Sequence, residues 1–349
     1  MNKIHRIDLP RIVLVGRGVL GNLGDVCEEL GLHRVLVATG RTTFKIAGER
    51  AQRNLQEAGL QARTVFVSDA DRENVQRVMR EAEAMRADAV MGVGGGRAID
   101  VAKLSAAGNG VMFISVPTTA SHDGIASSLA SIKGLERPYS VKAVAPIAVV
   151  ADSSIVAESP YRLTASGCGD VISKAVAVRD WRLAHEVNGE YYGEYAGNLA
   201  LMSSSLVMES AFKIRDRLEG GFRTLLEALV SCGVAMSVAG SSRPCSGSDH
   251  LFSHALDVLA PRPALHGEQC GVGAIMMARL HGLDWRSIRE SLQVIGAPVS
   301  AEGLGIGREV VIDALVKARE VRPERYTILN RVNLTDKTAA ALAEECGVL

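Results

Sequence analysis

Short apolar runs alternate with helical patterns through the first half of the chain. Six of these runs have the length of buried strands, and they cover residues 12–15, 34–38, 64–67, 89–93, 110–116 and 146–151. Helical patterns separate them, for example the charged stretch 72–86. Apolar strands separated by helices are typical of a mostly parallel sheet with helices on both faces. The pattern therefore predicts an α/β, Rossmann-like domain over residues 1–158.

The pattern changes after about Glu158-Ser-Pro160, where long helical stretches begin. These stretches cover residues 192–217, 222–239, 250–259, 271–280 and 312–319. Their apolar positions recur with the period of a helix, and no strand-like alternation lies between them. We expect residues 159–349 to form an all-α domain.

Composition excludes several classes of partner. Lys+Arg and Asp+Glu both number 39, and aromatic residues are only 4% of the chain, so no basic, aromatic nucleic-acid surface is expected. No uninterrupted apolar run approaches the ~20 residues of a membrane span. Residues 1–10 have no long apolar run after their charges, unlike a secretory signal. The six cysteines form no CxxC pair, which favours reduced thiols in a cytoplasmic protein.

A glycine-rich segment, Gly92-Val-Gly-Gly-Gly-Arg-Ala-Ile-Asp100, follows a predicted buried strand and opens a helix. Glycines let backbone amides approach a phosphate, and the helix N-terminus adds partial positive charge. A turn of this kind without any ligand is the alternative. The next strand ends in Val116-Pro-Thr-Thr-Ala-Ser-His-Asp-Gly124, whose small and hydroxyl side chains leave room for a ligand. Loops at the carboxyl ends of parallel strands are where ligands bind.

The loop after the second strand, Thr39-Gly-Arg-Thr-Thr-Phe-Lys45, has no acidic residue to hold a ribose 2′-hydroxyl. Arg41 and Lys45 could instead accept a 2′-phosphate, which favours use of NADP beside NAD. Both are equally compatible with ordinary surface charges.

Three of the eight histidines lie close together in the second half, at His250, His254 and His266. The first two are four residues apart, which places them on one face of a helix. Asp170 follows the small residues Ser166-Gly-Cys-Gly and is expected to open a helix, where an ordinary N-cap is the alternative. Asp170, His250 and His266 would make a mixed oxygen and nitrogen metal set with an open position. A surface helix with two histidines is the alternative, while a metalloprotease site is excluded because no glutamate follows the first histidine.

Several motifs together resemble a known superfamily. They are Gly94-Gly-Gly-Arg-Ala-Ile-Asp100, Pro117-Thr-Thr-Ala-Ser-His-Asp-Gly124, Ser166-Gly-Cys-Gly-Asp170, Ser242-Arg-Pro-Cys-Ser-Gly-Ser-Asp-His-Leu-Phe-Ser-His254, Leu265-His-Gly-Glu268 and Arg325-Tyr-Thr-Ile-Leu329. The chain resembles the glycerol dehydrogenase, iron-containing alcohol dehydrogenase and dehydroquinate synthase superfamily, and within it the sn-glycerol-1-phosphate dehydrogenases. The resemblance implies a dehydroquinate synthase-like fold over nearly the whole chain. Asp249 departs from the glutamate expected in many relatives, and we expect it to face solvent.

The resemblance also implies the roles of individual residues. Asp170, His250 and His266 would hold one zinc ion per subunit, and Asp123, Asp170 and His254 would contact substrate, with Asp123 and His254 catalytic. NAD(P) would lie along Gly96, Arg97, Ala98, Ile99, Asp100, Thr118, Thr119, Ala120, Ser121 and Ser127. Apart from the resemblance, a substrate phosphate needs cationic partners, and Arg243 is our first candidate and Lys174 the second. Each is equally compatible with an ordinary surface charge or a helix-stabilising pair. Glu268 either orients His266 or simply occupies the first turn of a helix.

The expected activity is NAD(P)H-dependent reduction of dihydroxyacetone phosphate to sn-glycerol 1-phosphate, for archaeal ether phospholipids. One alternative is glycerol dehydrogenase, with an unphosphorylated substrate. Another is a 3-dehydroquinate synthase-like lyase, which would want glutamate in place of Asp170. A nucleotide-binding regulator without chemistry is the non-enzymatic alternative, and the complete Asp/His/His set argues against it. We also expect a homo-oligomer.

Overall fold

The computed structural model describes residues 7–134 and 141–349. Most of the N-terminal segment that we judged not to be a secretory signal lies outside the described residues. The chain divides into two compact units, Met1–Pro160 and Tyr161–Leu349. The division falls two residues beyond the expected boundary at residue 158.

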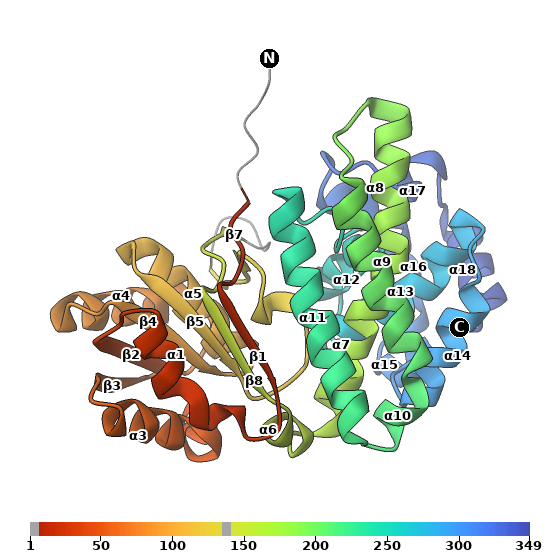
Figure 1. Ribbon diagram of the computed structural model, residues 1–349. Coiled ribbons are helices and arrows are strands. Elements are labelled where there is room, and N and C mark those ends of the chain that lie inside the picture. Colours follow the sequence, from red (N-terminus) through yellow and green to blue (C-terminus); the bar gives the residue numbers. More distant parts are fainter. Residues whose placement is uncertain (1–6, 135–140) are drawn as a thin grey trace. The chain divides into compact units, whose positions relative to one another are not determined.

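The first unit is built on a parallel sheet of six strands in the order β1-β8-β5-β4-β2-β3 (Figure 1). The strands are β1 (Ile12–Gly16), β2 (Arg34–Thr39), β3 (Gln61–Phe66), β4 (Ala89–Gly94), β5 (Met112–Pro117) and β8 (Ala148–Asp152). All six apolar runs therefore form the expected strands, with β3 beginning three residues early. The α/β prediction is confirmed.

Helices cover both faces of this sheet because successive residues of a buried strand point to opposite sides. Met91 and Val93 of β4 pack with α1 (Leu23–Glu29) and α3 (Glu49–Glu57). Val90 packs on the other face, with α4 (Arg72–Met85) and α5 (Gly96–Asn109). Both faces of each central strand are buried, and this explains why the runs read as continuously apolar.

Short elements connect these strands. The connection from β2 contains α2 (Arg41–Thr43) and the π-helix η2 (Phe44–Gly48), and η1 (Val19–Asn22) follows β1. Between β5 and β8 lie η3 (Asp123–Ile125) and a small antiparallel pair, β6 (Leu129–Ala130) with β7 (Val141–Lys142). We did not expect this pair, since strands of two residues leave no periodic pattern. The unit ends with α6 (Ser153–Ala157).

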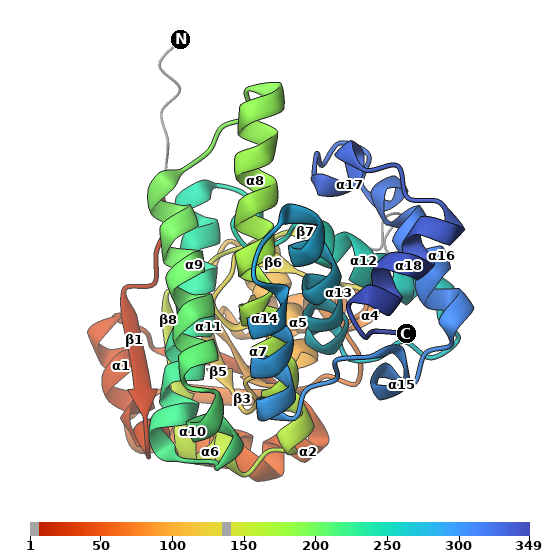
Figure 2. The same cartoon turned by 90° about the vertical axis from the view of Figure 1, so that its right-hand side faces the viewer.

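The second unit contains only helices in the part of the chain that the structure describes, as expected (Figure 2). They are α7 (Tyr161–Ile172), α8 (Lys174–Asn188), α9 (Glu194–Glu209), α10 (Ala211–Arg215), α11 (Glu219–Ala239), α12 (Ser248–Leu259), α13 (His266–His281), α14 (Trp285–Ile295), α15 (Ala301–Leu304), α16 (Arg308–Val321), α17 (Ile328–Arg331) and α18 (Asp336–Glu345). The predicted stretch 192–217 is divided at Ser210 into α9 and α10.

One described helix, α11, is long and apolar enough to cross a membrane. Its apolar window is 67% buried within the unit, where the helix packs beside α9 (Figure 2). Arg223 and Glu227 interrupt the apolar sequence and form an ion pair on its exposed side. This burial is typical of the core helix of a globular unit.

Candidate functional site

Asp170 lies inside α7 and does not open a helix, so our prediction for this segment was wrong. The small residues before it serve a close helix crossing rather than a turn. A Cβ atom added to Gly169 would lie 2.2 Å from the Gly267 carbonyl oxygen, and one added to Gly267 would lie 1.9 Å from that of Ser166. Only glycine permits α7 and α13 to approach this closely. The crossing brings Asp170 beside His266, at the start of α13.

Four potential metal ligands converge at this crossing. Asp170, His250, His266 and Cys270 each offer a ligand atom, and these atoms all lie within 4.8 Å of one another. His250 Nε2 is 3.6 Å from Asp170 Oδ1, and the rings of His250 and His266 are 4.9 Å apart. The structure thus brings together the three predicted ligands and adds Cys270, one turn after His266 on α13.

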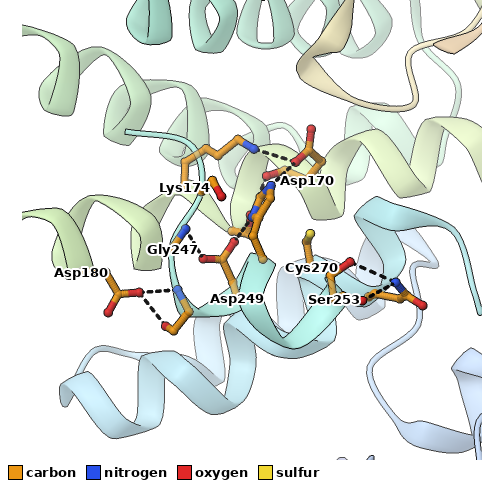
Figure 3. Close-up of polar contacts among 12 residues, drawn as sticks. Asp170, Lys174, Asp180, Gly247, Asp249, Ser253 and Cys270 are labelled. Atoms are coloured by element: carbon orange, nitrogen blue, oxygen red, sulfur yellow. Dashed lines mark hydrogen bonds and ion pairs between the residues drawn. The ribbon is translucent and has the colours of Figure 1, made fainter. Parts of the chain in front are cut away.

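Asp249 does not face solvent, contrary to our expectation. It is fully buried, and its Oδ2 lies 2.5 Å from His250 Nδ1 (Figure 3). A carboxylate on one ring nitrogen directs the other nitrogen towards a metal. His266 is held in a similar way, because Ser253 Oγ lies 3.2 Å from its Nδ1.

Burial and charge act differently on the groups of this cluster. Burial opposes ionisation of Asp170, but the charge of Lys174 and its hydrogen bond lead the effects that outweigh burial and hold the pKa of this carboxyl below its usual value. Burial and the nearby Lys174 keep the pKa of His250 well below its usual value, so its ring is neutral. Burial, with Asp249 and Asp170, raises the pKa of the Cys270 thiol well above its usual value. The Asp170 carboxylate and the His250 imidazole are therefore ready ligands, whereas the Cys270 thiol is not.

Two further predicted residues of the helical unit, His254 and Glu268, differ in their relation to this cluster. The His254 ring stacks on that of His266 at 5.9 Å, and its Nδ1 is 3.7 Å from Asp257 Oδ2. Glu268 accepts a hydrogen bond from the Leu265 amide and pairs with Arg162 at 2.7 Å. Glu268 therefore caps the first turn of α13, which was one of its two expected roles.

Both candidate phosphate cations already pair with carboxylates. Lys174 is fully buried, with its Nζ 2.6 Å from Asp170 Oδ1 (Figure 3). Arg243 is 5% exposed, and it donates to both oxygens of Glu190 and to the Tyr326 carbonyl. The sequence left both open as phosphate partners or as ordinary paired charges, and in the structure their charges are compensated.

In the α/β unit, three loops meet at the carboxyl ends of β2, β4 and β5. The direction in which successive strands are added to the sheet reverses between β2 and β4. From β2 the next strand, β3, lies towards one edge of the sheet, and from β4 the next strand, β5, lies towards the other edge. The Thr118 amide donates to the Gly94 carbonyl at 3.0 Å, and Thr43 Oγ1 lies 3.2 Å from where a Gly94 Cβ would be. Ligands of doubly wound sheets bind at such a reversal.

The glycine-rich turn at this reversal forms a cradle. Gly94 has a φ of +156°, and an added Cβ would meet Ala98 Cβ at 2.9 Å. Gly95 caps α5, whose first residues, Gly96 to Ala98, present backbone amides at a helix N-terminus. The Thr118 hydroxyl is buried and has no hydrogen-bond partner in the described structure. The turn and this hydroxyl fit a phosphate-bearing ligand.

Other predicted cofactor residues have structural partners. Asp100 is buried and accepts from the Ser131 amide at 3.1 Å. Ser127 is also buried and donates to the Leu129 carbonyl at 3.3 Å. Thr119 Oγ1 and Ser121 Oγ lie 3.5 Å apart at the loop after β5, where Ala120 is fully buried. Arg97 is exposed and 3.4 Å from the Ser68 carbonyl, while Ile99 is fully buried against the sheet.

The loop that carries Asp123 depends on a residue that we did not identify from the sequence. Lys103 is fully buried and donates to the Gly124 and Leu129 carbonyls at 2.7 and 2.6 Å. Its charge also acts on Asp123. A lysine on the buried face of a helix, among alanines and valines, was the signal that could have revealed it.

The positive charges after β2 lie in the same part of this unit. Arg41 stacks on the Phe66 ring, with its guanidinium carbon 4.8 Å from the ring centroid, and forms no ion pair with a carboxylate among the described residues. Lys45 is in η2. The described structure therefore leaves both charges uncompensated by an adjacent carboxylate.

Comparison with known proteins identifies the class first. The family model of iron-containing alcohol dehydrogenase matches residues 14–160. Among solved structures, the glycerol dehydrogenase of Schizosaccharomyces pombe has a TM-score of 0.83 at 18% identity, over 99% of this chain and 91% of that one. A probable glycerol dehydrogenase from Sinorhizobium meliloti has a TM-score of 0.78 at 23% identity, over 98% of both chains. These structures show that the fold is that of the iron-containing alcohol dehydrogenases and glycerol dehydrogenases.

Sequence relatives define the family more narrowly. Glycerol-1-phosphate dehydrogenase [NAD(P)+] of Methanosarcina barkeri is 53% identical over 94% of this chain and 92% of its own length. The enzyme of the same name from Thermococcus kodakarensis is 50% identical over 99% of each chain. The chain belongs to the glycerol-1-phosphate dehydrogenase family.

Proposed function

We propose that this chain reduces dihydroxyacetone phosphate to sn-glycerol 1-phosphate with NADH or NADPH, the reaction that supplies the glycerol of archaeal ether phospholipids. The observation that carries the proposal is the buried Asp170, His250 and His266 cluster, in a chain about 50% identical to enzymes of that name over nearly its full length. The two glycerol dehydrogenases of known structure compared above are less than 25% identical to this chain in sequence. This similarity supports a shared fold but not a shared substrate.

The donor set of the cluster fits zinc. One carboxylate oxygen and two imidazole nitrogens are ligands that zinc accepts, and three protein ligands leave a position for substrate. Asp170, His250 and His266 would hold the ion, with Asp249 and Ser253 orienting the two rings. The bound ion would polarise the ketone carbonyl of the substrate and stabilise negative charge on its oxygen.

The loops at the sheet reversal fit a dinucleotide. The amides of Gly96 to Ala98 would bind its phosphates, and the buried hydroxyl of Thr118 would gain the hydrogen bond that it lacks. Thr119 to Ser121 and Ser127 would line the same ligand. Because no acidic residue follows β2 and Arg41 is available, the chain would accept NADPH as well as NADH.

Two side chains would handle the substrate itself. His254, on the same face of α12 as His250, would donate a hydrogen bond or a proton to a substrate oxygen. Asp123, held on the loop that Lys103 fixes, would accept a hydrogen bond from a substrate hydroxyl. The hydride would come from the dinucleotide, and the protein supplies placement.

For the substrate phosphate we retain Arg243 as the proposed partner and Lys174 as the second. Phosphate binding by Arg243 requires it to exchange part of its pairing with Glu190. The substitution Arg243→Gln should then raise KM for dihydroxyacetone phosphate and leave KM for dihydroxyacetone unchanged. Equal effects on both substrates would show that Arg243 only supports the fold.

The decisive experiment follows the oxidation of NADH and NADPH with dihydroxyacetone phosphate and with dihydroxyacetone, before and after chelation. Fast, chelator-sensitive turnover of the phosphorylated substrate alone is expected, with restoration by zinc and an sn-1 product on chiral analysis. Preference for dihydroxyacetone would make the chain a glycerol dehydrogenase. No turnover of either substrate would favour the dehydroquinate synthase-like alternative.

We also propose that the chain self-associates in the cytoplasm. Tyr195, Met202 and Leu206 lie on one face of α9 and are 71%, 52% and 43% exposed. Contiguous exposed apolar residues on one helix face are typical of contacts between subunits. Sedimentation of the native chain should show an oligomer that Met202→Glu weakens, whereas Ile46→Glu, an exposed control in the α/β unit, should not.

A further inference from the structure

The helical unit has a pocket that shares no residue with the metal cluster. Its volume is about 420 Å³, within the usual size range of small-molecule sites. Helices α8, α13 and α17 and the residue after α17 form its walls. It is lined by Arg179, Arg182, Leu183, Glu186, Leu280, His281, Ile328, Arg331 and Val332.

Positive charge dominates this pocket. Arg179, Arg182 and Glu186 lie on one face of α8, and Arg331 ends α17 on another wall. Arg182 is occupied, since it stacks on the Tyr192 ring and lies 3.4 Å from Glu194. Arg179 and Arg331 form no ion pair with any carboxylate in the described residues. Two guanidinium groups therefore line one pocket without a counter-charge of their own.

The pocket is held in shape by a buried carboxylate beneath it. Asp180 is fully buried, and His281 Nε2 lies 2.9 Å from its Oδ1. The same oxygen accepts from the Ile328 amide at 2.7 Å, at the start of the helix that carries Arg331. Asp180 thus ties α8, α13 and α17 together. A binding site whose walls are fixed in advance loses little entropy on binding.

The same carboxylate connects the pocket to the metal-binding helix. Asp180 Oδ2 accepts from the amide and the hydroxyl of Ser248, both at 2.6 Å (Figure 3). Ser248 is the first residue of α12 and is followed by Asp249 and His250. A ligand that steadies the pocket would therefore steady the start of α12.

We propose that this pocket binds the phosphate group of a phosphate monoester, at a site separate from the proposed reaction. Guanidinium groups bind phosphate and carboxylate oxygens through paired N–H donors. Arg182 is paired with Glu194, so Arg179 and Arg331 are the two guanidinium groups available to a ligand. Both can pair with oxygens of one phosphate group, which offers more acceptor oxygens than a single carboxylate. The site stands independently of the activity proposed above.

Inorganic phosphate is the probe for a calorimetric titration of the full-length, zinc-loaded protein. The double variant Arg179→Gln/Arg331→Gln should lose one phosphate site per chain, with affinity reduced at least about tenfold. The matched control Arg50→Gln/Arg80→Gln removes two exposed arginines of the α/β unit and should bind as the native chain does. Phosphate bound at the proposed reaction site would remain in both variants, so a site lost only in the Arg179→Gln/Arg331→Gln variant can be assigned to the pocket.

A second measurement does not depend on the variants folding. Phosphate should slow amide hydrogen exchange in α17 and in the first turn of α12 of the native chain. Retention on vesicles that contain phosphatidic acid, lost in the double variant, would identify a lipid headgroup as the source of the phosphate. Binding of glycerol phosphate without retention on these vesicles would identify a free metabolite as the source. Equal phosphate binding by the native chain and the double variant would overturn the proposal. So would a change of oligomeric state in the double variant, because the pocket would then be a subunit contact.

Discussion

Around the proposed metal cluster, the burial of a residue determines its charge state and its partners more than its residue type does. Asp249 is an ordinary first-turn acid in the sequence, but inside the unit burial raises its pKa to about 7, and it lies against His250. The sequence left Lys174 and Arg243 open as phosphate partners or as paired charges, and both are paired in the structure. The sequence therefore indicated which residues belong to the site, but not which side chains they pair with.

Replacing Asp249 by Asn tests its orienting role. Asn cannot accept from His250 Nδ1 as strongly, so zinc affinity should fall about 10- to 100-fold, the usual cost of losing such a partner. Competition with a chromophoric chelator measures this affinity. Asp284→Asn, at the exposed start of α14, is the control and should bind zinc normally. Equal affinities in both variants would remove Asp249 from the site.

Among whole elements, the crossing of α7 and α13 determines whether the cluster exists. Gly169 and Gly267 are contact points at which two helix backbones nearly touch. Helical periodicity marks the buried face of each helix, but it does not say which helix lies opposite. This explains why the helices were predicted and their pairing was not.

The substitution Gly169→Ala should force the two helices apart. Overpacking of this kind costs about 1–3 kcal/mol or more, and the shift should also lower zinc content. Gly220→Ala in α11 is the control, since its Cβ would meet nothing within 4 Å and alanine favours a helix by about 0.4–1 kcal/mol. Urea unfolding and metal analysis of both variants measure the two effects. A stable, zinc-replete Gly169→Ala protein would contradict the crossing.

In the α/β unit, Asp152 at the end of β8 joins separate elements. It accepts from the Gly18 and Leu20 amides at 3.0 and 3.1 Å. Burial opposes its ionisation, but bonds from Ser154 and from these amides outweigh it and lower its pKa below the usual 3.8. The carboxylate therefore stabilises the fold above pH 3.8, and this contribution disappears as the pH falls through the lowered value.

We expect Asp152→Asn to lose about 1–3 kcal/mol of stability at pH 7, because a buried acceptor and its charge are removed. The difference from the native chain should shrink below pH 3.8, where the native carboxyl is also protonated. Urea midpoints between pH 7 and pH 3 measure this. A constant difference across that range would mean that the charge of Asp152 contributes nothing.

In the whole molecule, the proposed metal site and the proposed dinucleotide site lie in different compact units. The proposed metal site lies entirely within residues 161–349, and the glycine-rich cradle within residues 1–160. Each proposed ligand should therefore protect its own unit, because a ligand stabilises the structure that binds it.

Hydrogen exchange on the full chain tests this division. Adding zinc to the chelated protein should protect α7, α12 and α13, and adding NADPH should protect the segment from Gly94 to Gly124. Heat-denatured protein, treated identically, supplies the fully exchanged reference. Protection by zinc confined to the α/β unit would overturn the assignment of the helical unit to metal binding.

The sequence by itself determined the elements and much of the site. Buried strands and amphipathic helices leave periodic patterns, and two histidines four apart share a helix face wherever the helix lies. Only the tertiary structure decided that Asp170 reaches His266 across a glycine crossing, that Cys270 joins them, and that Asp249, Lys174 and Arg243 are paired. The physical reason is that a side chain's burial and partners depend on residues brought near by folding, and local periodicity carries no record of them.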